Sequence, residues 1–272
     1  SQMTKKYEEL RFIDDFFFCK ILMKNKALCK ELLELILNVK IEKIVFTEEQ
    51  KPIEITADGR GVSLDVYVED DSNTVYDIEM QSTLKKNLPK RSRYYQGIID
   101  LNLLERGADY NELKKSFVIF ICLEDPFEKG LHVYTFENHC KECPGLLLGD
   151  ETTKVFVNAA GTANDISDEM QEFMDYLQGL GTKNEFTRKL EDEVVKARAH
   201  KEWRVEYMSL ILRDHEMRAE GREEGREEGR EEIMRTVVIN MLNENEPIEK
   251  ICLYAGCDEE FVKKIKNVIL KS

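Results

Sequence analysis

Two carboxylates and one amide, Asp65, Glu79 and Gln81, lie close together in the first third of the chain. Residues 62–70, VSLDVYVED, alternate between apolar and polar types, and so do residues 74–81, TVYDIEMQ, which predicts two strands. Oxygen ligands suit a hard cation such as Mg²⁺, which binds one or two carboxylates and keeps several waters. Because such an ion activates water and offsets charge on a phosphoryl oxygen, the pattern predicts a metal site for phosphodiester hydrolysis.

The register of this hairpin follows from its own alternation, because a slip of one residue would turn every side chain to the wrong face. Three apolar pairs then lie opposite one another: Leu64 with Met80, Val66 with Ile78, and Val68 with Tyr76. A loop of three residues remains at 71–73, and its Asn73 suits a left-handed conformation. The same register sets Asp65 opposite Glu79, with Cβ atoms about 4.5–5.5 Å apart. Two carboxylates this close repel each other unless a positive group lies between them.

A strip of positive charge follows the second strand directly. It consists of Lys85, Lys86, Lys90, Arg91 and Arg93, and no acid lies between Glu79 and Asp100. The net charge of -14 argues against a nucleic-acid binder that uses its whole surface, but one local basic strip can still hold a phosphate backbone. Two simpler interpretations stay open. The strip could be a solvated loop and helix start, and the polar face of the hairpin could simply face water.

Helical and strand patterns are mixed around this hairpin, which predicts an α/β core. Helical periodicity covers residues 14–38 and the segment after Pro89. Strand patterns occupy residues 42–46, 117–123, 132–136 and 153–158. The segment 117–123, FVIFICL, is continuously apolar, which predicts a central strand covered on both faces.

Beyond Gly161 the strand patterns end, and helical patterns cover residues 168–178 and 184–242. The repeat GREEGREEGREE at 221–232 indicates a marginal, solvated helix or a semi-flexible linker, because glycine costs a helix about 1 kcal/mol relative to alanine. Two short helices are expected at the end of the chain, broken at 255–257 and with Asp258 capping the second. An αα-hairpin is favoured there over a DNA-binding helix-turn-helix, because the second helix begins with acids.

These patterns predict four parts and an all-helical C-terminal region. They are a core at 1–162, a helical extension at 163–220, the repeat at 221–232 and a helical hairpin at 233–272. The helical region is expected to be dispensable for folding of the core, and it offers a surface for a homo-oligomer.

The composition indicates the compartment in which the protein is expected. The chain has 272 residues, of which 42% are hydrophobic, and it contains no run of about 18 apolar residues that could cross a membrane. It begins without the apolar segment of a secretory signal, and its seven cysteines are scattered, which indicates free thiols in a reducing compartment. A cytoplasmic protein is therefore expected. His139, Cys140 and Cys143 form a short cluster, but structural zinc normally takes four ligands, so an incidental loop is favoured.

The pattern of Asp65 followed by Glu79-Met80-Gln81 resembles the Asp…Glu-x-Lys signature of the PD-(D/E)XK nucleases. More closely, the chain resembles the recombination-promoting nuclease (Rpn) branch of that superfamily. The similar segments include DDFFFCKIL at 14–22, LDVYVED at 64–70, YDIEMQ at 76–81, LPKRSRYYQGIID at 88–100, FVIFICLEDPF at 117–127, TKVFVNAAGT at 153–162 and EWRVEYM at 202–208. Their order and spacing make the resemblance specific up to about Glu232.

The resemblance implies a restriction-endonuclease-like fold, with a mixed sheet flanked by helices, and metal-dependent cleavage of DNA linked to recombination or mobile elements. It implies that Asp65 and Glu79 bind the metal, most simply Mg²⁺, and that Asp15 is an accessory acid. Gln81 stands where the superfamily usually has lysine. An amide is no useful proton acceptor, but it could orient the attacking water or offer its carbonyl oxygen to the metal.

Two other functions remain open. The chain could be a nuclease-fold protein whose catalytic centre has lapsed and which binds nucleic acid or serves in assembly. A purely structural interaction protein would rest on the acidic C-terminal helices, but it would leave the Asp65–Glu79 register as a coincidence.

Overall fold

The part of the chain that the computed structural model describes comprises residues 5–45, 64–83, 85–104 and 107–269. It forms two compact units, which divide between Arg204 and Val205 and are described separately. The first unit contains the sheet, and the second is helical.

The first unit is built on a mixed sheet, which has six strands among the described residues in the order β1-β2-β3-β4-β6-β5. The strands are β1 (Ile44–Val45), β2 (Val66–Asp70), β3 (Val75–Gln81), β4 (Ser116–Cys122), β5 (Val133–Phe136) and β6 (Thr152–Asn158). β3, β4 and β6 are parallel, and the other neighbouring pairs are antiparallel. β4 is the central apolar strand that the sequence predicts. The predicted strand at 42–46 is represented by β1, and Phe46 lies outside the described residues.

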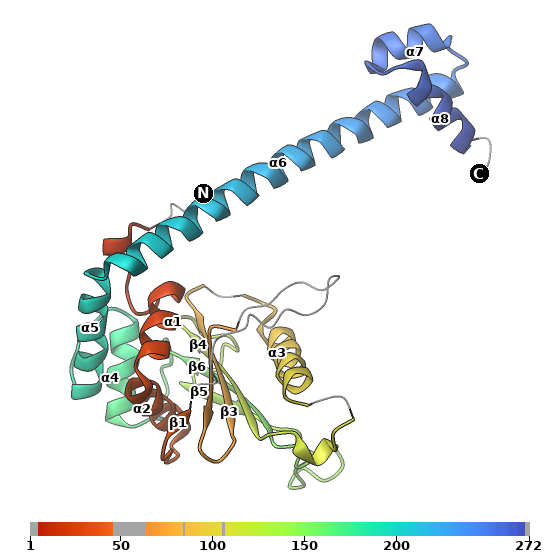
Figure 1. Cartoon of the computed structure of the whole chain (residues 1–272). Helices are drawn as coiled ribbons and strands as arrows, with labels where there is room; N and C mark the ends of the chain where they lie inside the picture. Colours follow the sequence, from red (N-terminus) through yellow and green to blue (C-terminus); the bar gives the residue numbers. More distant parts are fainter. Residues whose placement is uncertain (1–4, 46–63, 84, 105–106, 270–272) are drawn as a thin grey trace. The chain divides into compact units, whose positions relative to one another are not determined.

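Helices cover both faces of this sheet (Figure 1). They are α1 (Asp15–Lys24), α2 (Lys26–Leu37), α3 (Leu88–Leu103), α4 (Asp168–Leu177) and α5 (Glu185–Arg198). Figure 1 shows α3 on one side of the sheet and α1 and α2 on the other, with α4 and α5 packed against α1 and α2. The predicted fold class, a mixed sheet flanked by helices, is thus confirmed.

The hairpin of β2 and β3 has the predicted register. Val66 pairs with Ile78 and Val68 with Tyr76, and the loop of three residues carries Asn73 at φ 61°. β2 begins at Val66, so the predicted pairing of the residues before it is not part of the backbone ladder. The alternation of apolar side chains set this register because each face of the hairpin is buried against a different layer of helices.

The polar face of the hairpin does not face water. α3 docks on it, and one apolar cluster joins Val75 of β3 and Phe120 of β4 to Tyr95 and Ile98 of α3. Every residue of β3 is buried, including the carboxylates on this face. The interpretation of this face as a solvated side of the sheet is therefore wrong, because α3 excludes water from it.

Two long helical predictions are interrupted in the structure. The segment 14–38 divides at Asn25, whose side chain accepts a hydrogen bond from the main-chain N–H of Leu28 and so caps α2. The segment 184–242 divides at 199–200, between α5 and α6 (Lys201–Asn243). The side chain of asparagine competes with the helix for hydrogen bonds to the backbone, which is why asparagine is favoured at a helix cap and disfavoured in a helix interior.

α4 and α5 belong to the first unit. Phe173 of α4 and Phe186 and Leu190 of α5 are fully or almost fully buried, and the Tyr7 hydroxyl donates a 2.6 Å hydrogen bond to the main-chain oxygen of Ala197. This packing argues that the core extends past residue 162 to Arg204, where the first compact unit ends.

The second unit contains most of α6, together with α7 (Ile248–Ala255) and α8 (Glu259–Ile269). Its small apolar core includes Val238, Ile251, Val262 and Ile265. Gly256 ends α7 at φ 66°, and Asp258 caps α8, as predicted. The GREE repeat is helical within α6. Among the described residues, no helix is long and apolar enough to cross a membrane.

Candidate active site

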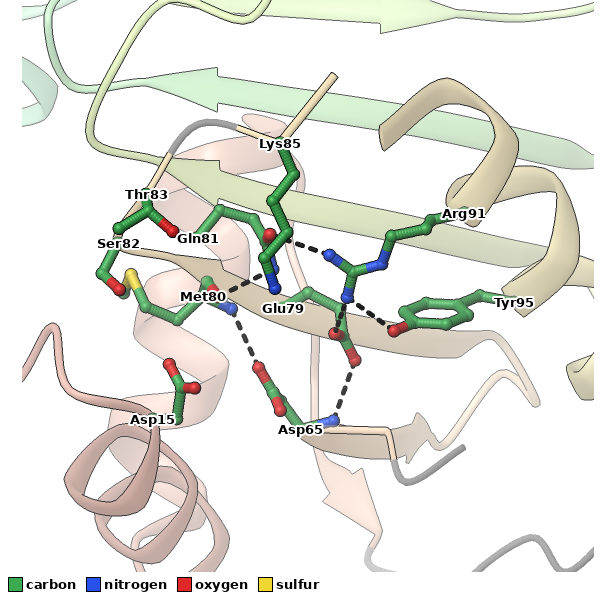
Figure 2. A pocket seen from close by; sticks show the side chains of 10 residues that line it. All are labelled: Asp15, Asp65, Glu79, Met80, Gln81, Ser82, Thr83, Lys85, Arg91 and Tyr95. Atoms are coloured by element: carbon green, nitrogen blue, oxygen red, sulfur yellow. Dashed lines mark hydrogen bonds and ion pairs between the residues drawn. The ribbon is translucent and has the colours of Figure 1, made fainter. Parts of the chain in front are cut away.

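Asp65 and Glu79 are joined through the backbone of the opposite strand. The main-chain N–H of Asp65 donates to Oε1 of Glu79 at 2.9 Å, and the N–H of Met80 donates to Oδ2 of Asp65 at 3.1 Å. These two side-chain hydrogen bonds thus join the two strands one residue beyond the last pair in the backbone ladder of the hairpin. Figure 2 shows both carboxylates at the same pocket, which is the neighbourhood that the register predicts.

The pocket is small and polar, with a volume of about 140 Å³. Its lining residues come from α1, the residue before β2, the end of β3, the following loop and α3, and they are Asp15, Asp65, Glu79, Met80, Gln81, Ser82, Thr83, Lys85, Arg91 and Tyr95. Since one water occupies about 30 Å³, the pocket has room for an ion with a few waters.

Asp15 reaches the pocket from the first turn of α1 (Figure 2). The described residues nevertheless include no group of three or more His, Cys, Asp or Glu side chains placed to hold a metal ion. A metal here would therefore take its protein ligands from Asp65 and Glu79, and the accessory role of Asp15 stays a prediction.

Burial dominates the electrostatics of the carboxylates. Glu79 is 2% exposed, and burial raises its pKa, which the charge of Asp65 raises further. Burial also raises the pKa of Asp65. Two buried acids at one pocket repel each other, and a divalent cation with oxygen ligands would offset that repulsion. The donor set therefore fits the expected metal.

Asp77 is a third acid on this face, and it is not among the site residues predicted from the sequence. It is completely buried beside Glu79, and among the described residues no hydrogen-bond donor satisfies its carboxylate oxygens by geometry. Burial and then the charge of Glu79 raise its pKa well above the ordinary value. Asp77 lies two residues before Glu79, so its side chain is on the same face of β3. This position alone could not identify it as a site residue, because the polar face of a hairpin can also simply face water.

Arg91 enters the pocket from α3 and contacts three side chains (Figure 2). Its Nη1 donates to Oε1 of Gln81 at 2.9 Å, and its Nη2 donates to the hydroxyl of Tyr95 at 2.6 Å. The same Nη2 lies 3.6 Å from Oε2 of Glu79. Gln81 in turn donates from Nε2 to the main-chain oxygen of Met80 at 2.8 Å. Both polar atoms of Gln81 therefore have partners within the protein.

The basic strip divides into two groups. Arg91 lies in the pocket, and Lys85 lines it, whereas Lys86, Lys90 and Arg93 are exposed on the loop and the first turns of α3. All five residues are predicted from the sequence to contact phosphate. The i,i+4 spacing of Arg91 and Tyr95 could have indicated that Arg91 belongs to one helix face with the aromatic ring.

The chain matches the model of a family described as PD-(D/E)XK nuclease family transposase over residues 13–209. The match covers more than half of the chain. The chain belongs to this family. The resemblance drawn from the hairpin and the surrounding motifs is thus confirmed, and the matched range includes every described pocket residue. Neither the curated proteins nor the solved structures compared with the chain gave a match.

Membership in the PD-(D/E)XK nuclease family supports a nuclease-related function and implies DNA as the substrate. Nucleases of this family generally use divalent metals. The matched range ends at residue 209, so it covers almost none of the second unit.

Proposed function

We propose that the protein is an Mg²⁺-dependent DNA endonuclease that acts in recombination or in the movement of mobile elements. The observation that carries this proposal is the reciprocal bonding of Asp65 and Glu79 at a polar pocket, in a chain of the PD-(D/E)XK nuclease family. Both carboxylates would hold the metal. A cytoplasmic location and a homo-oligomer through the C-terminal helices belong to the same proposal.

The residues of the pocket have distinct parts in this proposal. The bound metal would lower the pKa of a coordinated water and offset charge on a phosphoryl oxygen. Asp65 and Glu79 would hold the metal ion, and the exposed Lys86, Lys90 and Arg93 would bind phosphates on either side of the scissile bond. Because both polar atoms of Gln81 have protein partners, this residue would orient neighbouring groups rather than accept a proton.

The alternative function is DNA binding without cleavage. The observation in its favour is that Arg91 already lies beside Glu79, so that a positive side chain, instead of a metal, could balance the carboxylates. The protein would then bind nucleic acid or serve in assembly as a lapsed nuclease.

Plasmid nicking by the purified full chain distinguishes the two functions. Wild type is expected to nick supercoiled DNA with Mg²⁺ or Mn²⁺ and not with EDTA. Asp65→Ala and Glu79→Ala are expected to abolish nicking while the proteins stay folded, because each change removes one of two metal ligands. Equal nicking by wild type and Asp65→Ala would reveal a contaminating nuclease. DNA binding without nicking, across several metals and DNA forms, would favour the lapsed nuclease.

A further inference from the structure

Arg91 is held in the pocket more firmly than a residue that only binds DNA phosphates would need to be. Its side chain is 22% exposed, and its guanidinium lies 5.2 Å from the centre of the Tyr95 ring and 5.6 Å from that of Phe120. Its hydrogen bonds to Gln81 and Tyr95 point into the protein. A planar guanidinium with donors in a fixed fork, stacked on aromatic rings, is suited to setting the positions of its partners.

The partners of Arg91 are the residues on which the proposed chemistry depends. Glu79 is almost completely buried, and its Oε2 lies 3.6 Å from the guanidinium while its Oε1 bonds the backbone of Asp65. Gln81 is 6% exposed, and its amide is oriented by Arg91 on one side and by the oxygen of Met80 on the other. Movement of Arg91 would therefore shift both side chains.

Charge gives Arg91 a second role. Asp65, Asp77 and Glu79 are three acids at one pocket and the strand beside it, and among the described residues the cations that act on them are Arg91 and Lys85. Lys85 is exposed to solvent, whereas Arg91 is partly buried beside Glu79. A charge in low dielectric acts more strongly than one in water, so Arg91 is the effective counter-charge when the carboxylates hold no metal.

We propose that Arg91 is a positioning residue of the active centre, which holds Glu79 and Gln81 in place and balances the carboxylates until a divalent metal does so. This inference rests on the proposed function for the identity of the metal site. It separates Arg91 from the exposed residues of the basic strip. Arg93 lies two residues further along α3 and is exposed, which makes it a matched control.

The first test needs no activity. Thermal unfolding of the full chain is measured at about pH 8, where part of Glu79 is ionised, in EDTA and in Mn²⁺ for wild type, Arg91→Gln and Arg93→Gln. In EDTA, Arg91→Gln is expected to unfold at a lower temperature than the other two, because Glu79 loses its counter-charge. Mn²⁺ is expected to raise the Tm of Arg91→Gln more than that of wild type, because the metal replaces the missing charge. A Mn²⁺ shift of Arg91→Gln no larger than that of Arg93→Gln overturns the proposal.

A double-mutant cycle in EDTA checks the contact itself. Arg91→Gln is expected to lower the Tm less in a Glu79→Gln background than in wild type, because no buried carboxylate is then left without a counter-charge. Equal losses in both backgrounds would show that Arg91 does not balance Glu79.

The second test separates positioning from DNA affinity. In single-turnover cleavage at saturating metal, Arg91→Gln is expected to lose on the order of 100-fold in rate, as misplaced catalytic groups do. Its affinity for DNA in Ca²⁺ should match that of wild type, whereas Arg93→Gln, which removes an expected phosphate contact, should bind DNA more weakly. A normal rate with weakened binding for Arg91→Gln would make it a phosphate contact and overturn the proposal.

Arg91→Lys keeps the test decisive if Arg91→Gln does not fold. Lysine retains the charge but lacks the fork, so the variant is expected to fold and to cleave more slowly than wild type. A wild-type rate for Arg91→Lys would overturn positioning by the fork. If wild type itself does not cleave DNA, the proposed function fails, and the Mn²⁺ shift and the double-mutant cycle still decide the role of Arg91.

Discussion

The carboxylate of Glu79 accepts a 2.9 Å hydrogen bond from the main-chain N–H of Asp65, the residue that precedes β2. Each of these two acids is therefore positioned by the strand that carries the other, because Asp65 in turn accepts the N–H of Met80. Removal of either side chain leaves one backbone donor of the hairpin without its acceptor and would also remove one of the two proposed metal ligands. Asparagine and glutamine keep an acceptor for that donor, so Asp65→Asn and Glu79→Gln are better probes of metal binding than alanine variants.

Gln81→Ala is expected to lower both the cleavage rate and the free energy of unfolding. Arg91 loses an acceptor for a charged donor, a loss of about 1–3 kcal/mol. The rate should fall less than in Asp65→Ala, because Gln81 is not expected to bind the metal. Gln96→Ala is the matched control, since Gln96 is a buried glutamine that bonds Ser116 and Asp100. It should lose stability and keep its cleavage rate. Equal rates for the two alanine variants would remove Gln81 from the active centre.

The exposed part of the basic strip is expected to govern DNA affinity. Joint replacement of Lys86, Lys90 and Arg93 by glutamine should weaken binding to all DNA sequences. It should also flatten the salt dependence by about one unit of log-log slope for each lost phosphate contact. The control replaces exposed lysines of another surface: Lys26, Lys40 and Lys43. If both triple variants show the wild-type slope, the strip is only a solvated surface.

Stability without metal should fall as the pH rises. Burial and the charge of Asp65 raise the pKa of Glu79 from 4.5 to about 8. Between these values the folded protein binds a proton at Glu79 that the unfolded chain releases, so the stabilising effect is complete below pH 4.5 and is lost by about pH 8. Urea unfolding in EDTA across this range should show a flatter pH dependence for Glu79→Gln than for wild type. Glu260→Gln changes an exposed acid and should follow wild type. A wild-type slope in Glu79→Gln would contradict the raised pKa.

Truncation tests where the core ends. A chain ending at Arg204 is expected to unfold cooperatively, because it keeps the whole first unit. A chain ending at Gly161 is expected to lose that cooperativity, contrary to the boundary inferred from the strand patterns. It lacks Phe173, Phe186 and Leu190, and burial of each such side chain contributes about 1.5–3 kcal/mol. Cooperative urea unfolding of the shorter chain would restore the boundary at residue 162.

The hairpin and its pair of carboxylates could be predicted from the sequence alone. Side chains alternate along a strand with a period of two, so Val66 and Ile78 in the apolar layer fix the faces of all their neighbours. Asp65 and Glu79 follow from that register without knowledge of any other element. The central strand β4 was predictable for a related reason, since a continuous apolar run has to be covered on both faces.

The surroundings of those carboxylates depended on how α3 docks. Local periodicity predicts that a helix follows Pro89, but it does not say which face of the sheet the helix covers. Because α3 lies over the polar face of the hairpin, Asp77 is completely buried and Arg91 lines the pocket of Asp65 and Glu79. A side chain is buried when layers from distant parts of the chain pack together. Its pKa shift and the charges beside it depend on that packing. The period of two along the strands brings Asp65 and Glu79 together, whereas Arg91 lies beside them because α3 packs on that face of the sheet.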